Sequence, residues 1–376
     1  MLSEPTYLAA RMISSTLEER FGSYLKTWKE QKKTTELTPG SFIEAIIDAA
    51  FWASLQHEEG YAPRISIAFV PPEEVEQPLV FGHKVRLTPY NLVKLSPAAT
   101  RPGIHLGVWH EDDDLFIWGS AHLIPERCFV LEVIEPGLLV IKHKQAGGFG
   151  KFVNVAVLTG NQIKIIDKES IPAAAPFVTS LLGTSLPLHT GESINVLVEL
   201  AASIRSHGRG ALVLVVPPGS QKWRESVIHP ITYPVIPAYD ALTELMQMKE
   251  SERGTPKWQE SFSQALQIVG GFTAVDGATI LTQQHRLLAF GAKVARATVS
   301  TPAEQVMITE PVLNGEPRIV HPAKIGGTRH LAAAQFIHDQ RDSIALVASQ
   351  DGRFTVFVWS EKLAMVQAHR IDVLLL

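Results

Sequence analysis

The stretches VDGATI, at residues 275–280, and GGTRH, at residues 326–330, decide how the second half of this chain is interpreted. In the first, an acid and a glycine interrupt an apolar run, which predicts a strand that begins beside Asp276. In the second, two glycines precede an alanine-rich segment at 331–337, which predicts the start of a helix. Two further apolar runs follow, and the Asp-Gly pair at 351–352 between them is typical of a tight hairpin turn. This order of strands and helices predicts an α/β unit with a mixed sheet.

The same two stretches contain the residue types that hold a phosphorylated ligand. Two adjacent glycines let the backbone pass close to a ligand. Thr328 is the predicted N-cap of the helix, whose first N–H groups and partial positive charge suit a phosphate. Arg329 adds a charged donor fork, His330 a donor, acceptor or metal ligand, and Asp276 a carboxylate for a divalent cation or a proton. Each stretch taken alone is more often an ordinary capped helix or an Asp-Gly turn.

Together, and in this order, the stretches resemble the diadenylate cyclase domain, the family that joins two ATP molecules into cyclic di-AMP. Residues 276–278 match its Asp-Gly-Ala motif, and residues 327–330 match most of its Gly-Thr-Arg-His-Arg motif. Residues 344–349 with Gly352 are similar to its third strand and turn, and GRGALVLV at 208–215 resembles the strand that opens the domain. The resemblance covers about residues 190–365, the C-terminal half of the chain.

This resemblance implies a reaction and a set of roles. Two domains would face each other, each holding one ATP, and the 3′-hydroxyl of each nucleotide would attack the α-phosphate of the other. Asp276 would hold Mg²⁺ or Mn²⁺, with Asp351 as a second candidate metal ligand. The implied catalytic residues are Asp276, Arg329 and His330, and the implied nucleotide-binding residues are Gly277, Ala278, Gly327, Thr328, Arg329 and Ser349.

The sequence also departs from the family pattern. Leu331 stands where the family has the second arginine of Arg-His-Arg, and Gln350 and Asp351 stand where it has paired glutamates. Removing one such donor elsewhere costs about 3–4 kcal/mol of barrier stabilisation; Lys293, Arg296 and His321 are the candidates to replace it. Two alternatives therefore stay open: a nucleotide-binding sensor that has lost the chemistry, and an interaction scaffold that uses no nucleotide.

Composition describes an ordinary globular protein. The chain has 376 residues, 45% of them hydrophobic and 19% charged, which predicts two domains with ample cores. The net charge of −4 gives no global basic field for nucleic acid. Cys128 is the only cysteine, which excludes a disulfide framework and fits a reducing compartment. No apolar run approaches the roughly 18 residues of a membrane helix, and no export signal opens the chain, so we expect a cytoplasmic protein.

The domain organisation predicted from the pattern is a sensor domain at 1–170, a linker at 171–189 and the nucleotide-binding domain at 190–376. The first domain begins with two helices and continues, from about residue 64 to 168, with mostly antiparallel strands. The run FGKFVNVAV at 149–157 is similar to sensor modules that precede diadenylate cyclase domains. That similarity implies an unidentified small-molecule or protein effector that biases the C-terminal half.

A group of aromatic and histidine side chains falls on the strands of this first domain. The group could line a ligand pocket, although packing within the core and at sheet edges is the commoner role. Its members are His105, Trp109, His110, Trp118 and His122.

Overall fold

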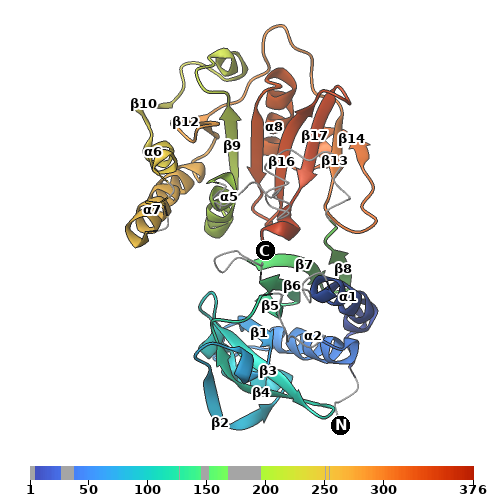
Figure 1. The fold of residues 1–376 in the computed structure, drawn as a ribbon. Helices are drawn as coiled ribbons and strands as arrows, with labels where there is room; N and C mark the ends of the chain where they lie inside the picture. Colours follow the sequence, from blue (N-terminus) through green and yellow to red (C-terminus); the bar gives the residue numbers. More distant parts are fainter. Residues whose placement is uncertain are drawn as a thin grey trace. The chain divides into compact units, whose positions relative to one another are not determined.

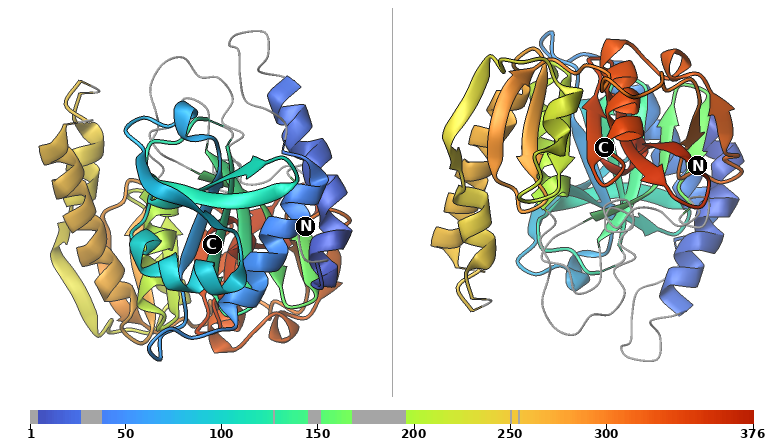
Figure 2. Two further views of the ribbon diagram at one scale, coloured as in Figure 1. Left: turned by 90° about the horizontal axis from the view of Figure 1, so that it is seen from below. Right: turned by 90° about the horizontal axis from the view of Figure 1, so that it is seen from above.

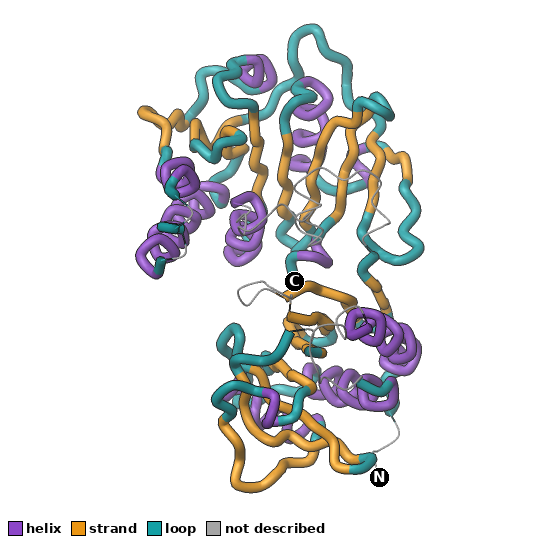
Figure 3. The backbone as a smooth tube through the Cα atoms, in the orientation of Figure 1, coloured by secondary structure: helices purple, strands orange, loops and turns teal. Residues whose placement is uncertain are grey.

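The computed structural model describes residues 5–26, 38–126, 128–144, 152–167, 196–249, 251–253 and 255–376. The chain divides into two compact units, residues 1–166 with Leu376 and residues 167–375. We call them the N-terminal and the C-terminal unit. Each contains helices and one mixed sheet, so the predicted α+β and α/β class is confirmed (Figures 1 and 3).

The N-terminal unit is an eight-stranded sheet covered on one face by helices. The strand order is β2-β4-β3-β1-β5-β6-β7-β8, and all neighbours are antiparallel except β1 and β3. Apolar residues of the helices and of this sheet face form one core, and α1 and α2 lie side by side (Figure 2). The elements are α1 (Leu8–Lys26), α2 (Gly40–Ser54), β1 (Ile65–Phe69), η1 (Pro72–Glu74), β2 (Leu79–Arg86), α3 (Pro89–Leu95), η2 (Ser96–Ala99), β3 (His105–Glu111), β4 (Asp114–Ala121), β5 (Phe129–Glu135), β6 (Leu138–Lys144), β7 (Phe152–Thr159) and β8 (Gln162–Ile165).

The C-terminal unit is built on a nine-stranded sheet in the order β10-β12-β11-β9-β15-β16-β17-β13-β14. Only β9 with β11 and β13 with β17 are parallel. The elements are α5 (Val196–His207), β9 (Ala211–Val216), η3 (Lys222–Ser226), β10 (Tyr233–Tyr239), α6 (Ala241–Gln247), α7 (Pro256–Thr273), β11 (Ala278–Thr282), β12 (Leu287–Ala292), β13 (Val306–Thr309), β14 (Arg318–Val320), η4 (Pro322–Lys324), α8 (Thr328–Asp339), β15 (Ile344–Ala348), β16 (Phe354–Ser360), β17 (Met365–Arg370) and η5 (Asp372–Leu374).

Helix α8 covers the middle of this sheet through its small and aromatic residues. Ala333, Ala334, Phe336 and Ile337 are fully buried and share one core with alternate residues of β9 and β15. Alternate strand residues face the helix, and the small side chains of Ala333 and Ala334 let the helix lie close to them. None of the helices in the described part of the chain has the length and apolar character needed to cross a membrane.

Candidate functional site

One edge of the nine-stranded sheet collects segments that are far apart in the sequence. Strands β9 and β11 are parallel and both begin there, with Ala278 opposite Leu212. Strand β15 is antiparallel to β9 and ends there, with Ala348 opposite Ala211. Since neighbouring strands lie about 4.8 Å apart, the start of β11 and the end of β15 are about 10 Å apart. We call the residues at this edge, 208–210, 276–278 and 349–353, the site edge.

Arg329 brings the first turn of α8 to the site edge. A Cβ atom added to Gly210 would lie 2.9 Å from Arg329 Nη1 and 3.2 Å from the carbonyl oxygen of Ala348. Gly210 also has φ +73°, so both its backbone and its surroundings require glycine. Within the described part of the chain, the guanidinium of Arg329 has no hydrogen bond or ion pair. It is therefore free to bind an anion.

The start of α8 differs by one residue from the prediction. Thr328 is the first helical residue, and the N-cap is Gly327, which has no side chain to bond the helix amides. The prediction of Thr328 as N-cap was therefore wrong. Both residues are exposed, and a Cβ added to Gly327 would contact nothing within 4 Å. A ligand can approach this turn.

Asp276 is exposed in the short connection between α7 and β11. Gly277, with φ +105°, faces β12 so closely that a Cβ would lie 2.5 Å from the carbonyl carbon of Gly291. Ala278 is fully buried as the first residue of β11. The structure thus gives Gly277 and Ala278 packing roles, and contact with a nucleotide stays a prediction for both.

Ser349 and Asp351 belong to the turn between β15 and β16. The amide of Gly352 donates to Ser349 O at 3.2 Å, and the amide of Ser349 donates to Arg353 O at 2.9 Å. The carboxylate of Asp351 forms an exposed ion pair with Arg353 at 3.4 Å. Asp351 is therefore engaged by a neighbour in its own turn.

The site edge offers few side chains that could act as ligands for a cation. Among the described residues, no three His, Cys, Asp or Glu side chains gather as a metal site. Strand β9 separates Asp276 from the turn that carries Asp351. Mg²⁺ bound to nucleotides commonly takes one or two carboxylates together with phosphate oxygens. The single carboxylate of Asp276 fits a cation that arrives with a nucleotide, and it does not fit a resident protein-held cation.

His330 faces the sheet instead of the solvent. Its side chain is 2% exposed, its Nε2 lies 3.5 Å from Thr355 Oγ1, and its ring meets Phe357 edge-on at 6.0 Å between centroids. Burial, followed by the charge of Arg370, lowers its pKa to about 4. The imidazole is neutral at pH 7, and this position favours a packing role over direct contact with a phosphate.

We expect Gly326→Ala to destabilise the protein by about 1–3 kcal/mol, because a Cβ there would overlap the buried ring of His330. The matched variant is Gly327→Ala, which adds the same methyl group to open space and should cost less than about 1 kcal/mol. Calorimetric unfolding of both variants is the measurement. Equal losses of stability would contradict the packing role of residue 326.

Two arginines near this turn were not among the sequence-based candidates. Arg353 precedes β16, and Arg370 ends β17, and both carry charge that acts on His330. No local motif marks either residue, because their proximity to α8 depends on the register of β15, β16 and β17. Of the candidates proposed to replace the missing arginine, Lys293 follows the end of β12 at the site edge.

In the N-terminal unit, four members of the aromatic and histidine group pack into the fold, whereas His122 is exposed. Trp118 is 2% exposed and donates from Nε1 to the carbonyl of Val70 at 2.8 Å. His105 is 1% exposed, bonded to Ser66 Oγ at 2.7 Å, and burial lowers its pKa to about 4. His110 stacks on Phe42 at 4.9 Å. These contacts favour packing over a ligand pocket.

Comparison with known families bears on this unit. A family model described as "Probable sensor domain DACNV" matches residues 32–122. The N-terminal unit carries a sensor-domain match. The matched stretch includes α2 and extends through β4. It does not include the run at 149–157 that suggested a sensor module in the sequence, and residues 149–151 of that run lie outside the described residues.

The family-model match at residues 32–122 does not extend to the C-terminal unit. No cyclase domain is detected in the C-terminal half. No curated protein matches the chain.

Proposed function

We propose that the C-terminal unit binds ATP at the site edge and condenses two ATP molecules into cyclic di-AMP with release of two pyrophosphates, and that the N-terminal unit regulates this reaction. One observation carries the proposal. Asp276, Arg329 and Ser349 come from three separate segments, in the order of the cyclase motifs, and all three lie at one edge of one sheet. A matched sensor domain of the kind fused to diadenylate cyclases precedes them.

Each residue has a role that fits its surroundings. Arg329, which has no protein partner in the described residues, would bind phosphate oxygens and stabilise charge in the transition state. Gly327 and Thr328 would present the first amides of α8 to the same phosphates. Ser349, with its backbone fixed in the β15–β16 turn, would line the phosphate end of the site.

Asp276 would approach the attacking 3′-hydroxyl and help to remove its proton. A Mg²⁺ or Mn²⁺ ion that enters with ATP would neutralise phosphate charge, with Asp276 as its protein ligand and Asp351 as a candidate second one. Each C-terminal unit would hold one ATP, so two copies of the chain must face each other for the reaction to proceed. Self-association is thus part of the proposed mechanism, and a small molecule or protein bound by the N-terminal unit would control it. The proposal involves no nucleic-acid partner.

A second candidate function is a nucleotide-binding sensor without chemistry. Its support is specific: Leu331 is 38% exposed and apolar where the cyclase family has an arginine, and His330 is buried and neutral. Gln350 is an exposed amide where the family has a carboxylate. Such a site could retain affinity for nucleotide while losing the charge needed in the transition state.

The test is mass spectrometry of the products formed by the full chain with ATP and either Mg²⁺ or Mn²⁺. We expect cyclic di-AMP from the unchanged protein. Asp276→Asn should lower turnover by at least about 100-fold, the usual contribution of a positioned proton acceptor. Asp276 is exposed, so this variant should keep its fold.

Calorimetric titration with ATP completes the test. Binding of ATP without product, at high protein concentration and with both metals, would favour the sensor. Neither binding nor turnover would reject both proposals and leave an interaction scaffold.

A further inference from the structure

Three arginines from different elements surround the first turn of α8. Arg329 lies on α8, Arg353 follows the β15–β16 turn, and Arg370 ends β17. All three exert their charge on His330, and among the described residues Asp351 is the one acid that acts on it in the opposite direction. The carboxylate of Asp351 is already paired with Arg353. A local excess of positive charge therefore lies at the site edge of a chain whose net charge is −4.

The register of the sheet fixes the side chain of Arg370 next to α8. Arg370 is directly opposite Thr355 in the β16–β17 pair, so their side chains lie on the same face of the sheet. Thr355 Oγ1 is 3.5 Å from Nε2 of His330, which identifies that face as the one covered by α8. The adjacent backbone is held by the bond from the amide of Ile371 to Phe354 O at 2.8 Å.

Arg370 also has an unmet hydrogen-bonding need. Its Nε is buried and has no hydrogen-bond partner within the described part of the chain. A buried donor without an acceptor is costly, and a charged donor more so. Arg370 as a whole is only half-buried, so its guanidinium is accessible in part to an anion beside the first turn of α8, which would supply an acceptor and neutralise the positive charge.

We propose that Arg370 binds the polyphosphate group of the nucleotide and replaces the arginine that is missing at position 331. The inference rests on the proposed nucleotide site and adds to it a phosphate-binding residue that lies on a different strand. Guanidinium groups suit this role because their fixed fork of donors matches phosphate oxygens.

The other candidates for replacing the arginine fit less well. Arg296 lies next to Ala297, whose amide donates to Asp339 at the last turn of α8. This end of the helix is about 16 Å from Thr328. His321 accepts a bond from the amide of Ala323 at 3.2 Å and caps its own turn. Lys293 follows the end of β12, which is separated from β17 by four strands of the sheet. Arg370 alone among these four residues is placed beside His330.

The experiment measures binding of ATP, adenosine and inorganic tripolyphosphate by calorimetry for the full chain and for Arg370→Gln. We expect a loss of about tenfold to 100-fold in affinity for ATP and for tripolyphosphate, the size expected for a charge-assisted hydrogen bond. Affinity for adenosine should not change. The matched control is Arg341→Gln, which removes the same charge from an exposed residue before β15, at the opposite end of the sheet. It should bind all three ligands as the unchanged protein does.

Rescue separates phosphate binding from a structural role. Leu331→Arg restores the family residue at an exposed position of α8, so adding it to Arg370→Gln should recover most of the lost affinity for ATP. Arg370→Lys keeps the charge without the fork of donors, and its affinity for ATP should lie between that of the unchanged protein and that of Arg370→Gln. If Arg370→Gln does not fold, Arg370→Lys replaces it in the comparison.

The outcomes are distinct. If the unchanged protein binds ATP and Arg370→Gln binds it equally well, the role of Arg370 is rejected and the nucleotide site stands. If Arg370→Gln loses affinity for adenosine as strongly as for ATP, with lower thermal stability and no rescue by Leu331→Arg, Arg370 is structural and the inference is rejected. If the unchanged protein binds neither ATP nor tripolyphosphate, both the inference and the proposed function fail.

Discussion

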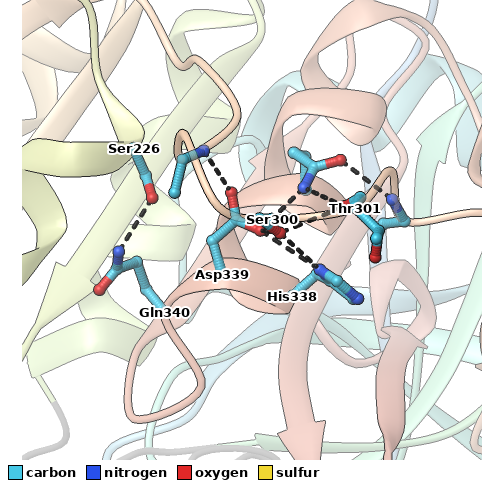
Figure 4. Close-up of polar contacts among 9 residues, drawn as sticks. Ser226, Ser300, Thr301, His338, Asp339 and Gln340 are labelled. Atoms are coloured by element: carbon cyan, nitrogen blue, oxygen red, sulfur yellow. Dashed lines mark hydrogen bonds and ion pairs between the residues drawn. The ribbon is translucent and has the colours of Figure 1, made fainter.

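Replacing Asp339 by alanine is expected to lower the free energy of unfolding of the C-terminal unit by about 3–5 kcal/mol, the usual range for breaking a buried charged network. The carboxylate is fully buried at the last turn of α8. An acid is unfavourable at a helix C-terminus, where the helix dipole is negative, so it must be stabilised by donors. Figure 4 shows the group of polar residues that provides them.

The donors to Asp339 tie α8 to the connection between β12 and β13. The amide of Ala297 donates to Oδ2 at 2.9 Å, and Gln335 Nε2 donates to Oδ1 at 2.8 Å. The hydroxyl of Ser300 also donates to Oδ1, and His338 Nδ1 lies 3.2 Å from it. Alanine would leave these groups without their acceptor and would remove the bonds that hold residues 297–300 to the helix, whereas Thr301 and Ala303 keep their bonds to Gln335.

The matched control is Asp342→Ala, three residues further along the chain. Asp342 is exposed, and its recorded contact is made by its backbone carbonyl, which accepts from Gln283 Nε2. It should change stability by less than about 0.5 kcal/mol. Urea unfolding monitored by tryptophan fluorescence gives both values. A loss for Asp339→Ala as small as that for Asp342→Ala would show that solvent replaces the buried acceptor without cost.

The sequence predicted part of each sheet. The apolar runs at β9 and β15, in which only Ile344 is not fully buried, were recognised from their continuous apolar residues. Strands β2, β10, β13, β14 and β17 were not predicted. Three of them, β2, β10 and β14, lie at the ends of their sheets, and most of their side chains are exposed or half-buried, so the apolar pattern that predicts strands is weak there. Strands β13 and β17 are mostly buried, so burial alone does not decide which strands the sequence reveals.

The candidate site was predictable only in part, for a related reason. The motif residues Asp276, Arg329 and Ser349 could be expected at one edge, because strand order and helix position follow from the family resemblance. The burial of His330 could not, since it depends on the absence of a side chain at Gly326 and on contact with β16. Arg370 was not foreseen because its place beside α8 follows from strand register, which a single sequence does not reveal.

Acidification from pH 6.5 to 5 is expected to destabilise both units, and the C-terminal unit more strongly. His105 in the N-terminal unit and His330 and His369 in the C-terminal unit are at most 2% exposed, and burial lowers the pKa of each to about 4. In the unfolded chain their pKa is about 6.5. The pKa values of His207 and His285, also in the C-terminal unit, are lowered by burial too.

The direction in which pH changes the free energy of unfolding follows from proton uptake. Between pH 6.5 and 4, the unfolded imidazoles bind protons that the folded ones do not, so the free energy of unfolding falls as the pH falls. Each histidine that is fully neutral in the folded state and fully charged in the unfolded state contributes a slope of about 1.4 kcal/mol per pH unit. The stability that the neutral histidines contribute to the folded state is fully present above pH 6.5 and is progressively lost as the pH falls below it. The window above pH 5 also limits interference from carboxylates, whose ordinary pKa values are near 4.

Urea unfolding at pH 7.5, 6.5, 5.8 and 5.2 gives the slope, and the imidazole ring signals in NMR spectra of the folded protein give the individual pKa values. We expect the signals of His105, His330 and His369 to show no titration down to pH 5. His369→Gln should reduce the pH slope of the free energy of unfolding of the C-terminal unit by the amount that corresponds to one proton, because His369 is fully buried and its ring, within the described part of the chain, bonds Thr309 Oγ1 at 2.7 Å. Stability that stays constant across this range, or ring signals that titrate near pH 6.5, would mean that water reaches these imidazoles and that the packing of His330 beneath the site edge is looser than its contacts with Thr355 and Phe357 imply.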